Sequence, residues 1–245
     1  MKPATKRAAQ KACSSPLTDL FPKGYYPPLT SEMKKIMKEL QEIVANPVVE
    51  AAYNDSVANV DPLVMELGFQ QENPWTGTTV DDFVCYFEKW FTFLPQTTSG
   101  LGFIVPLTFF YLNNPSAFNF LNQLQSKSGK SKKYSKEIFN WSVKFIKARG
   151  RFMDSKQSTY YMKEWMNSLG PSKKDFIIPK GGYQSFNEFF TRSLNPKTDP
   201  RPISDPDDEA VLVASADTEI NFIESNLTLQ TSLPVKTHEL NVMEL

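Results

Sequence analysis

Helix-type periodicity fills the middle of this chain and then stops, and this contrast limits what the chain can fold into. From about residue 29 to residue 170, apolar residues return every three or four positions, as on one face of an α-helix. Gly170-Pro171 ends the last of these patterns, because proline lacks the backbone amide that a helix interior needs. Strand-like runs begin only near Phe176. The sequence therefore predicts an α+β protein, in which an N-terminal all-α domain precedes the first elements of a β-rich core.

Start and stop signals divide the helical part into segments. Asn46-Pro47 ends one amphipathic helix and starts the next, and Thr79 precedes an acidic first turn that suits the helix dipole. A turn at Gly150 is expected to separate the last two helices, and the lysine-rich residues 126–135 are expected to form an exposed loop or a helix start. The expected helices cover residues 31–45, 48–58, 61–68, 79–94, 101–112, 116–124, 137–148 and 159–169.

Residues 101–112 are the most apolar part of the chain. A membrane-spanning helix needs about 20 such residues, and this run is shorter and contains Pro106. The sequence favours a buried core helix over an element that dips into a membrane, and no transmembrane span is predicted.

Composition sets the limits of the domains and excludes some partners. We expect a flexible tail over residues 1–28, a helical domain over residues 29–175 and the incomplete start of a core over residues 176–245. The 27 basic and 27 acidic residues cancel, which leaves no electrostatic case for nucleic acid. No apolar stretch follows the basic N-terminus, so a secretory signal is not expected.

The two cysteines, Cys13 and Cys85, lie in very different surroundings. Cys13 falls in the expected tail and Cys85 in an apolar helix, so we do not expect a structural disulfide. This interpretation favours a reducing compartment and a cytoplasmic location. No cluster of histidine, cysteine and acidic residues has the spacing of metal ligands, so no metal site is predicted.

A short aromatic helix follows the helical domain. Ser185 and Glu188 have the spacing of a capping box, in which each side chain accepts a hydrogen bond from a backbone amide. A buried stripe is expected on one face, with Asn187, Glu188 and Arg192 turned away. The stripe consists of Phe186, Phe189, Phe190 and Leu194. The same interpretation makes Glu188 and Arg192 a surface or capping pair, or a contact to a partner region.

Prolines 196, 200 and 202 then hold the chain extended. The apolar run at residues 210–214 is expected to form a buried strand that ends at Asp217. Asp217 is thus placed where a strand meets a loop, a position that suits either a catalytic acid or a turn-forming residue.

The order of these elements resembles the opening segment of the phosphatidylserine decarboxylase family, the pyruvoyl-dependent carboxy-lyases. The residues that carry the resemblance are Tyr183, Phe186-Asn187-Glu188-Phe189-Phe190, Arg192, Leu194, Pro196 and Arg201-Pro202-Ile203. In that family a strand ending in Ser-Pro-Ala-Asp-Gly follows, and its Asp belongs to the self-processing set. Here Ala216 and Asp217 match, whereas Ser215 stands where proline is usual and Thr218 where glycine is usual.

The helical half resembles the N-terminal region of fungal decarboxylases of this family. Tryptophan decarboxylases are among them, and their substrate is a free amino acid. The resemblance therefore implies either phosphatidylserine or an aromatic amino acid such as tryptophan as substrate, and Asp217 as the acid that orients a catalytic histidine.

The resemblance also implies a pyruvoyl cofactor made from a serine of the chain itself. Family members carry the histidine and that serine in later segments, neither of which is found in these 245 residues. The single histidine, His238, lies in a different context and is expected at the surface. We therefore expect a truncated chain that contains no cofactor and is inactive by itself.

Three functions remain open from the sequence. The chain is the front part of a decarboxylase, a non-catalytic module that binds a partner or regulates a relative, or an all-α ligand-binding protein with a vestigial tail. In the first two cases residues 211–213 and 220–223 would present an open sheet edge, which favours self-association or pairing with the missing core.

Overall fold

The structure is a computed structural model, and it forms two compact units, residues 1–198 and residues 199–245. The domain limits predicted from the sequence at residues 28 and 175 stay predictions. The structure describes residues 13, 15–60, 73–97, 102–122, 124–126, 132–134, 136–211, 213, 225–235, 238–241 and 243. The helix predicted at residues 61–68 lies outside them.

The first unit is built from α-helices and short 3-10 helices. The α-helices are α1 (Ser31–Val44), α2 (Pro47–Ala58), α4 (Val80–Phe91), α5 (Ile104–Tyr111), α6 (Pro115–Asn122), α7 (Glu137–Met153), α8 (Met162–Ser168) and α9 (Phe186–Phe190). The 3-10 helices are η1 (Pro16–Leu20), η2 (Lys156–Thr159) and η3 (Gly170–Asp175). The predicted starts of α1, α2 and α4 are confirmed, and in each a side chain caps the first turn.

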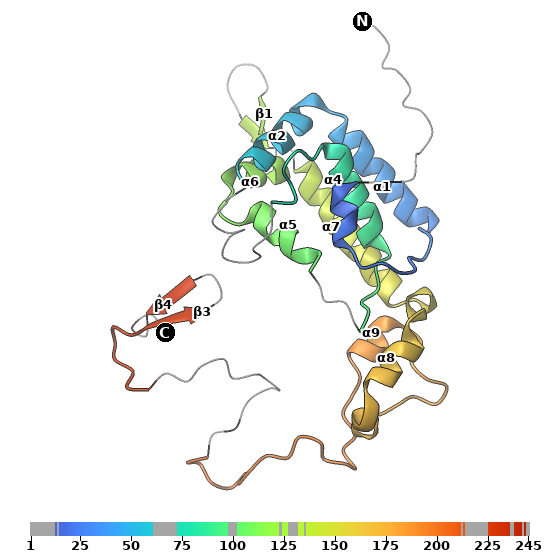
Figure 1. The fold of residues 1–245 in the computed structure, drawn as a ribbon, viewed down its shortest axis with the longest axis vertical. Coiled ribbons are helices and arrows are strands. Elements are labelled where there is room, and N and C mark those ends of the chain that lie inside the picture. Colours follow the sequence, from blue (N-terminus) through green and yellow to red (C-terminus); the bar gives the residue numbers. More distant parts are fainter. Residues whose placement is uncertain are drawn as a thin grey trace, which may run out of the picture. The chain divides into compact units, whose positions relative to one another are not determined.

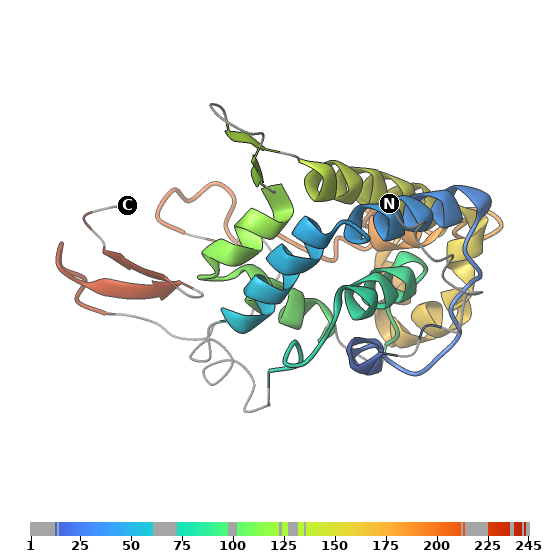
Figure 2. The same cartoon turned by 90° about the horizontal axis from the view of Figure 1, so that it is seen from above.

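The long helices α1, α4 and α7 lie side by side, and α2 packs on α6 (Figures 1 and 2). The apolar face predicted for α1 is buried, and Trp141 of α7 donates an indole hydrogen bond of 2.8 Å to the carbonyl of Ile36. Aromatic rings fill the space between the helices; Phe87 meets both Trp141 and Phe145 edge to face at 5.1 Å. Such pairs add to the hydrophobic gain of burial.

Arg149 of α7 closes the C-terminal end of α4. Its guanidinium donates to the carbonyls of Trp90, Phe91 and Phe93 at 2.8–3.0 Å. The last carbonyls of a helix lack partners within the helix, and a cation is favoured at that end. Burial lowers the pKa of Arg149 to about 10, which leaves the side chain charged at neutral pH.

Residues 15–28, which we call the strap, pack on the helices although the sequence places them in a flexible tail. Leu17 and Phe21 are buried, and the Phe21 ring stacks on Phe103 at 4.5 Å. Cys13, just before the strap, forms a disulfide with Cys85 of α4. The expectation that no disulfide forms is therefore wrong. It failed because a tail was assumed where Leu17 and Phe21 bury apolar surface against the helices.

The apolar run predicted as a core helix forms α5, which covers eight residues. Two of these, Pro106 and Phe110, are buried, and Phe103 just before the helix is buried as well. Trp75 donates to the carbonyl of Pro106 at 2.8 Å, which ties α5 to the core. Among the described residues, no helix has both the length and the apolar character needed to cross a membrane.

Two local predictions are corrected. α7 continues through Gly150 to Met153, where the sequence predicted a turn, because Phe152 and Met153 add buried side chains beyond the glycine. At the described positions of the lysine-rich segment, residues 126 and 132–134, the chain is strand where a loop or a helix start was expected. The strands β1 (Leu124–Ser126) and β2 (Lys132–Tyr134) pair in antiparallel orientation.

The α+β prediction is wrong, because the described residues beyond 176 form no β-rich core. Phe176 and Leu194 make an isolated bridge, and no strand includes residues 210, 211 and 213. Val213 is 49% exposed, so this described part of the expected buried strand has no apolar surface to pack against. In the second unit, β3 (Ser232–Val235) and β4 (His238–Asn241) pair as a two-stranded hairpin. The described part of the chain is predominantly helical.

Candidate functional site

The segment that resembles the decarboxylases is built around α9. Ser185 caps the helix, and its hydroxyl accepts a hydrogen bond from the amide of Glu188 at 3.1 Å. In a capping box the carboxylate of Glu188 would accept a hydrogen bond from the amide of Ser185. Here it accepts from the amide of Gln184 instead. The predicted start of the helix is thus confirmed, and the reciprocal half of the capping pattern is displaced by one residue.

The buried stripe predicted for α9 is confirmed for part of its length. Phe189 is 8% exposed and stacks on Trp165 of α8 at 5.7 Å, whereas Phe190 is 68% exposed. Leu194 is also exposed, because α9 ends at Phe190 and the chain leaves the helical course before Leu194. One side of α9 packs on α8, and Phe190 lies at the surface.

Polar contacts tie α9 to the end of α7. The buried hydroxyl of Ser158 accepts from the amide of Phe186 at 2.8 Å and donates to backbone carbonyls of its own turn. The Asn187 side chain donates to the carboxylate of Asp154 at 2.7 Å. The part of the decarboxylase-like segment around α9 therefore belongs to the helical unit, whereas residues 201–203 lie in the second unit.

Arg192 does not pair with Glu188, the arrangement that the sequence favoured. Its guanidinium lies over the rings of Phe176 at 4.2 Å and Phe189 at 4.8 Å, and it donates to the carbonyl of Phe189 at 3.1 Å. Contact with two ring faces stabilises the cation more than an ion pair with a solvent-exposed carboxylate does. Its Nε is buried without a hydrogen-bond partner in the described structure.

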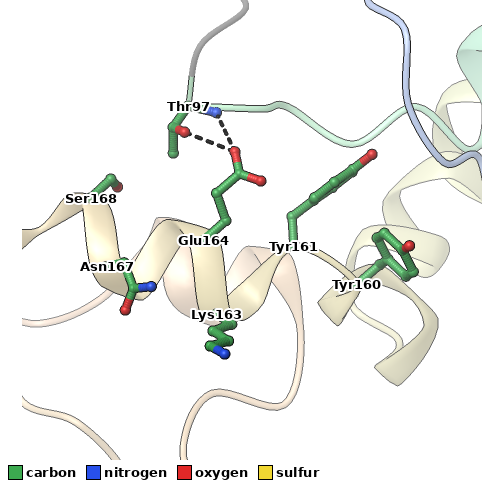
Figure 3. A pocket seen from close by; sticks show the side chains of 7 residues that line it. All are labelled: Thr97, Tyr160, Tyr161, Lys163, Glu164, Asn167 and Ser168. Carbon is green, nitrogen blue, oxygen red and sulfur yellow. Dashed lines mark hydrogen bonds between the residues drawn. The ribbon is translucent and has the colours of Figure 1, made fainter.

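A second feature is an open depression of about 570 Å³ beside α8 (Figure 3). It is lined by Thr97, Tyr160, Tyr161, Lys163, Glu164, Asn167 and Ser168. The Glu164 carboxylate accepts from the amide and hydroxyl of Thr97 at 3.1 and 2.8 Å, and Lys163 points away from it. The Tyr161 hydroxyl accepts from the amide of Tyr25 at 2.8 Å. The Glu164 carboxylate and the Tyr161 hydroxyl are thus engaged in hydrogen bonds that connect segments of the chain, and we assign no reactive group to the depression.

Asp217, the catalytic candidate from the sequence, lies outside the described residues. His238 lies on β4 opposite Val235, and its side chain is not described. The described residues therefore bring together no serine, histidine and acid that could form or hold a pyruvoyl group. No group of three potential metal ligands occurs among them either.

Several residues that position the segment were missed by the sequence analysis. Ser158 and Trp165 bear no motif, and their contacts with Phe186 and Phe189 span more than 20 residues of sequence. Phe189 lies close to Arg192 in sequence, and arginine stacks on ring faces, but the second ring, Phe176, comes from another segment and no local signal points to it.

Comparison with known proteins supports a relationship to decarboxylases. Over 92 residues the chain is 34% identical to the "Phosphatidylserine decarboxylase proenzyme" of Clostridium novyi (strain NT). The match covers 38% of this chain and 30% of that protein, so the chain spans about a third of the length of the relative. No protein-family model matches the chain. No solved structure matches it.

Proposed function

We propose that this chain is the N-terminal portion of a phosphatidylserine-decarboxylase-like carboxy-lyase, in a family that uses a pyruvoyl group. The observation that carries the proposal is the 34% identity over 92 residues to a phosphatidylserine decarboxylase proenzyme. The motif around Phe186, Phe189 and Arg192 agrees with it, since these residues form one docked structural element.

The proposal assigns different roles to the two parts of the chain. The helical unit holds α9 in place through Ser158, Asp154 and Trp165. Asp217 is proposed as the acid that orients a histidine during self-processing. We derive no step through the pyruvoyl group, because the described residues do not provide its surroundings.

The substrate and the location belong to the proposal as well. Phosphatidylserine and an aromatic amino acid such as tryptophan are the two candidates, and the choice between them stays open. A cytoplasmic location stays a prediction, and the Cys13–Cys85 disulfide removes the argument from the cysteines that favoured it. Isolated from the rest of an enzyme, the chain is proposed to contain no cofactor and to be inactive.

The alternative is a non-catalytic module that binds a partner or regulates a relative. The exposed Phe190, Leu194 and Ile177 favour it, since large apolar side chains at a surface often mark contact sites. Self-association or pairing with the missing core remains a prediction, but residues 211 and 213 lie in no strand and residues 220–223 lie outside the described residues.

Carbon dioxide release tests the proposal. Purified chain is incubated with carboxyl-labelled phosphatidylserine and, separately, with carboxyl-labelled tryptophan, and its intact mass is measured. We expect an unchanged mass and no release from residues 1–245, but self-cleavage and release from a gene product that continues through histidine- and serine-containing segments. Release from residues 1–245 that hydroxylamine abolishes would contradict the proposed inactivity.

Variants of the longer product separate the role of Asp217 from general effects. Asp217→Asn should slow its self-cleavage, because the histidine would lose its orienting acid. Asp208→Asn is the control, since the Asp208 carboxylate accepts from the amide of Ala210 in an exposed turn. If the longer product neither cleaves nor releases carbon dioxide, the regulatory alternative replaces the enzyme.

A further inference from the structure

We propose that Cys13 and Cys85 form a redox-sensitive latch that holds the strap, residues 15–28, on the helical unit. Their Cα atoms are 5.3 Å apart, within the range that a disulfide needs. Cys85 lies in the middle of α4, and Cys13 lies two residues before the strap. The bond thus fixes the N-terminal end of the strap to the helix at the centre of the fold.

The first half of the strap makes weaker contacts to the same helix. Lys89 donates to the carbonyl of Thr18 at 2.7 Å, and the Ser15 side chain forms a hydrogen bond with the Asp82 carboxylate. Phe21 packs among Tyr86, Phe93 and Phe103. Apart from the buried rings, these contacts are partly open to water, where each contributes little.

The second half of the strap reaches α8. The amide of Tyr25 donates to the Tyr161 hydroxyl, and the two rings of Tyr25 and Tyr160 stack at 4.1 Å. Gln96 donates to the carbonyl of Lys23 at 3.1 Å. The strap therefore joins α4 to the α8–α9 region, and release of its N-terminal end weakens a tie between those parts.

Exposure makes Cys13 the sulfur that a reductant can reach. Cys13 is exposed, while Cys85 is partly covered. A small thiol or a dithiol oxidoreductase attacks the Cys13 sulfur as a thiolate, the Cys13–Cys85 bond breaks, and the Cys85 thiolate takes up a proton. A second thiolate then resolves the mixed disulfide, so that two thiols of the reductant become one disulfide and two protein thiols form.

The length of the closed loop gives the size of the effect. The cysteines are 72 residues apart, and a disulfide over such a loop restricts the unfolded chain strongly. For a protein of this size, the loss should lower Tm by roughly 8–16 °C. The strap should detach before the helices unfold, because its buried area is small compared with that of the helical core.

Trypsin cleavage after Lys23 tests the latch in the full chain. Air-oxidised protein and protein reduced with a dithiol are digested at 25 °C, and far-UV circular dichroism is recorded for both. We expect cleavage at Lys23 at least tenfold faster in the reduced protein, with the helical signal unchanged. Lys144 on α7 is the internal control, and its cleavage should be slow in both states.

Alkylation and a variant complete the test. Iodoacetamide should label no cysteine in the oxidised protein and two after reduction, as read from the intact mass. Cys13→Ser leaves α4 untouched and should match the reduced protein in both Tm and cleavage. Free thiols in the oxidised protein, equal cleavage at Lys23 in both redox states, or equal acceleration at Lys23 and Lys144 would each overturn the proposal.

Discussion

Phe189 and Phe190 are neighbours in sequence, but α9 turns one toward Trp165 and the other toward water. Phe189→Ala should lower the free energy of unfolding by about 3 kcal/mol, because it removes a buried ring and leaves a cavity. Phe190→Ala is the matched control and should change it by less than about 0.5 kcal/mol. Urea unfolding followed by tryptophan fluorescence measures both, and equal losses would contradict the orientation of α9.

A second pair of variants compares two arginines of α7. Arg149→Met removes three hydrogen bonds to the end of α4 and should cost about 2–4 kcal/mol of stability. Arg151→Met removes an ion pair with Glu32 in which both side chains are more than half exposed, and should cost less than about 1 kcal/mol. Thermal unfolding distinguishes the two, and a larger loss for Arg151 would refute the capping role of Arg149.

Low pH should reduce the stability of the folded protein because Asp82 becomes protonated. Burial by itself raises the pKa of this carboxyl, but hydrogen bonds from Ser15 and Thr79 outweigh burial and hold the pKa below its usual value. The unfolded chain therefore takes up the proton first, so the stabilisation is complete above about pH 4 and is lost as the pH falls through the folded pKa.

The corresponding variant makes this pH dependence testable. Asp82→Asn should lower Tm at pH 7 and reduce the fall in Tm between pH 5 and pH 3. Asp81→Asn keeps both hydrogen bonds from Thr79 to Asp82 and should show the full fall. An unchanged acid profile for Asp82→Asn would mean that other carboxyl groups dominate.

Residues whose role depends on local sequence were predictable. Thr79, Asn46 and Ser185 cap helices as expected, since a cap involves side chains and amides two or three residues apart. The surroundings of Arg192 and the exposure of Phe190 were not predictable, because they depend on Phe176 and Trp165, which come from other elements.

Among the contacts between elements, the hydrogen bond between the amide of Phe186 on α9 and the hydroxyl of Ser158 on η2 is the most informative one to remove. Ser158→Ala leaves the partly buried amide of Phe186 without its acceptor and should cost about 1–3 kcal/mol. Thr159→Ala removes a hydrogen bond within its own turn and serves as the control. Hydrogen exchange of the Phe186 amide should accelerate in the first variant alone, and unchanged exchange there would exclude this contact.

Amphipathic helices with strong patterns were predicted well, as α1 and α4 show. The predictions that failed concern elements whose secondary structure depends on residues far away in the sequence. Residues 210, 211 and 213 carry an apolar pattern typical of a strand, but a strand needs neighbours to pair with, and the described residues supply none. The candidate site follows the same rule: its helix was predictable, and its packing was not.

At the scale of the whole molecule, the first unit should fold by itself, and its strap should add to its stability. A chain of residues 13–198 should show one cooperative thermal transition by circular dichroism, close to that of the full chain. A chain of residues 29–175 should melt at lower temperature, since it lacks Leu17, Phe21 and the ring of Phe189. Equal melting temperatures for the two chains would show that the strap contributes nothing to the core.

The strap also has a consequence for the order of events during synthesis. Tyr25 leaves the ribosome early, but its hydrogen-bond partner Tyr161 follows 136 residues later. At the usual pace of translation this is an interval on the order of ten seconds. Cys85 and the rings that Phe21 contacts also follow later in the chain, so for the first part of that interval Cys13 and Phe21 lack their partners. The strap is therefore placed only after much of the helical unit has been made, and chaperones and thiol chemistry can act on it in the meantime.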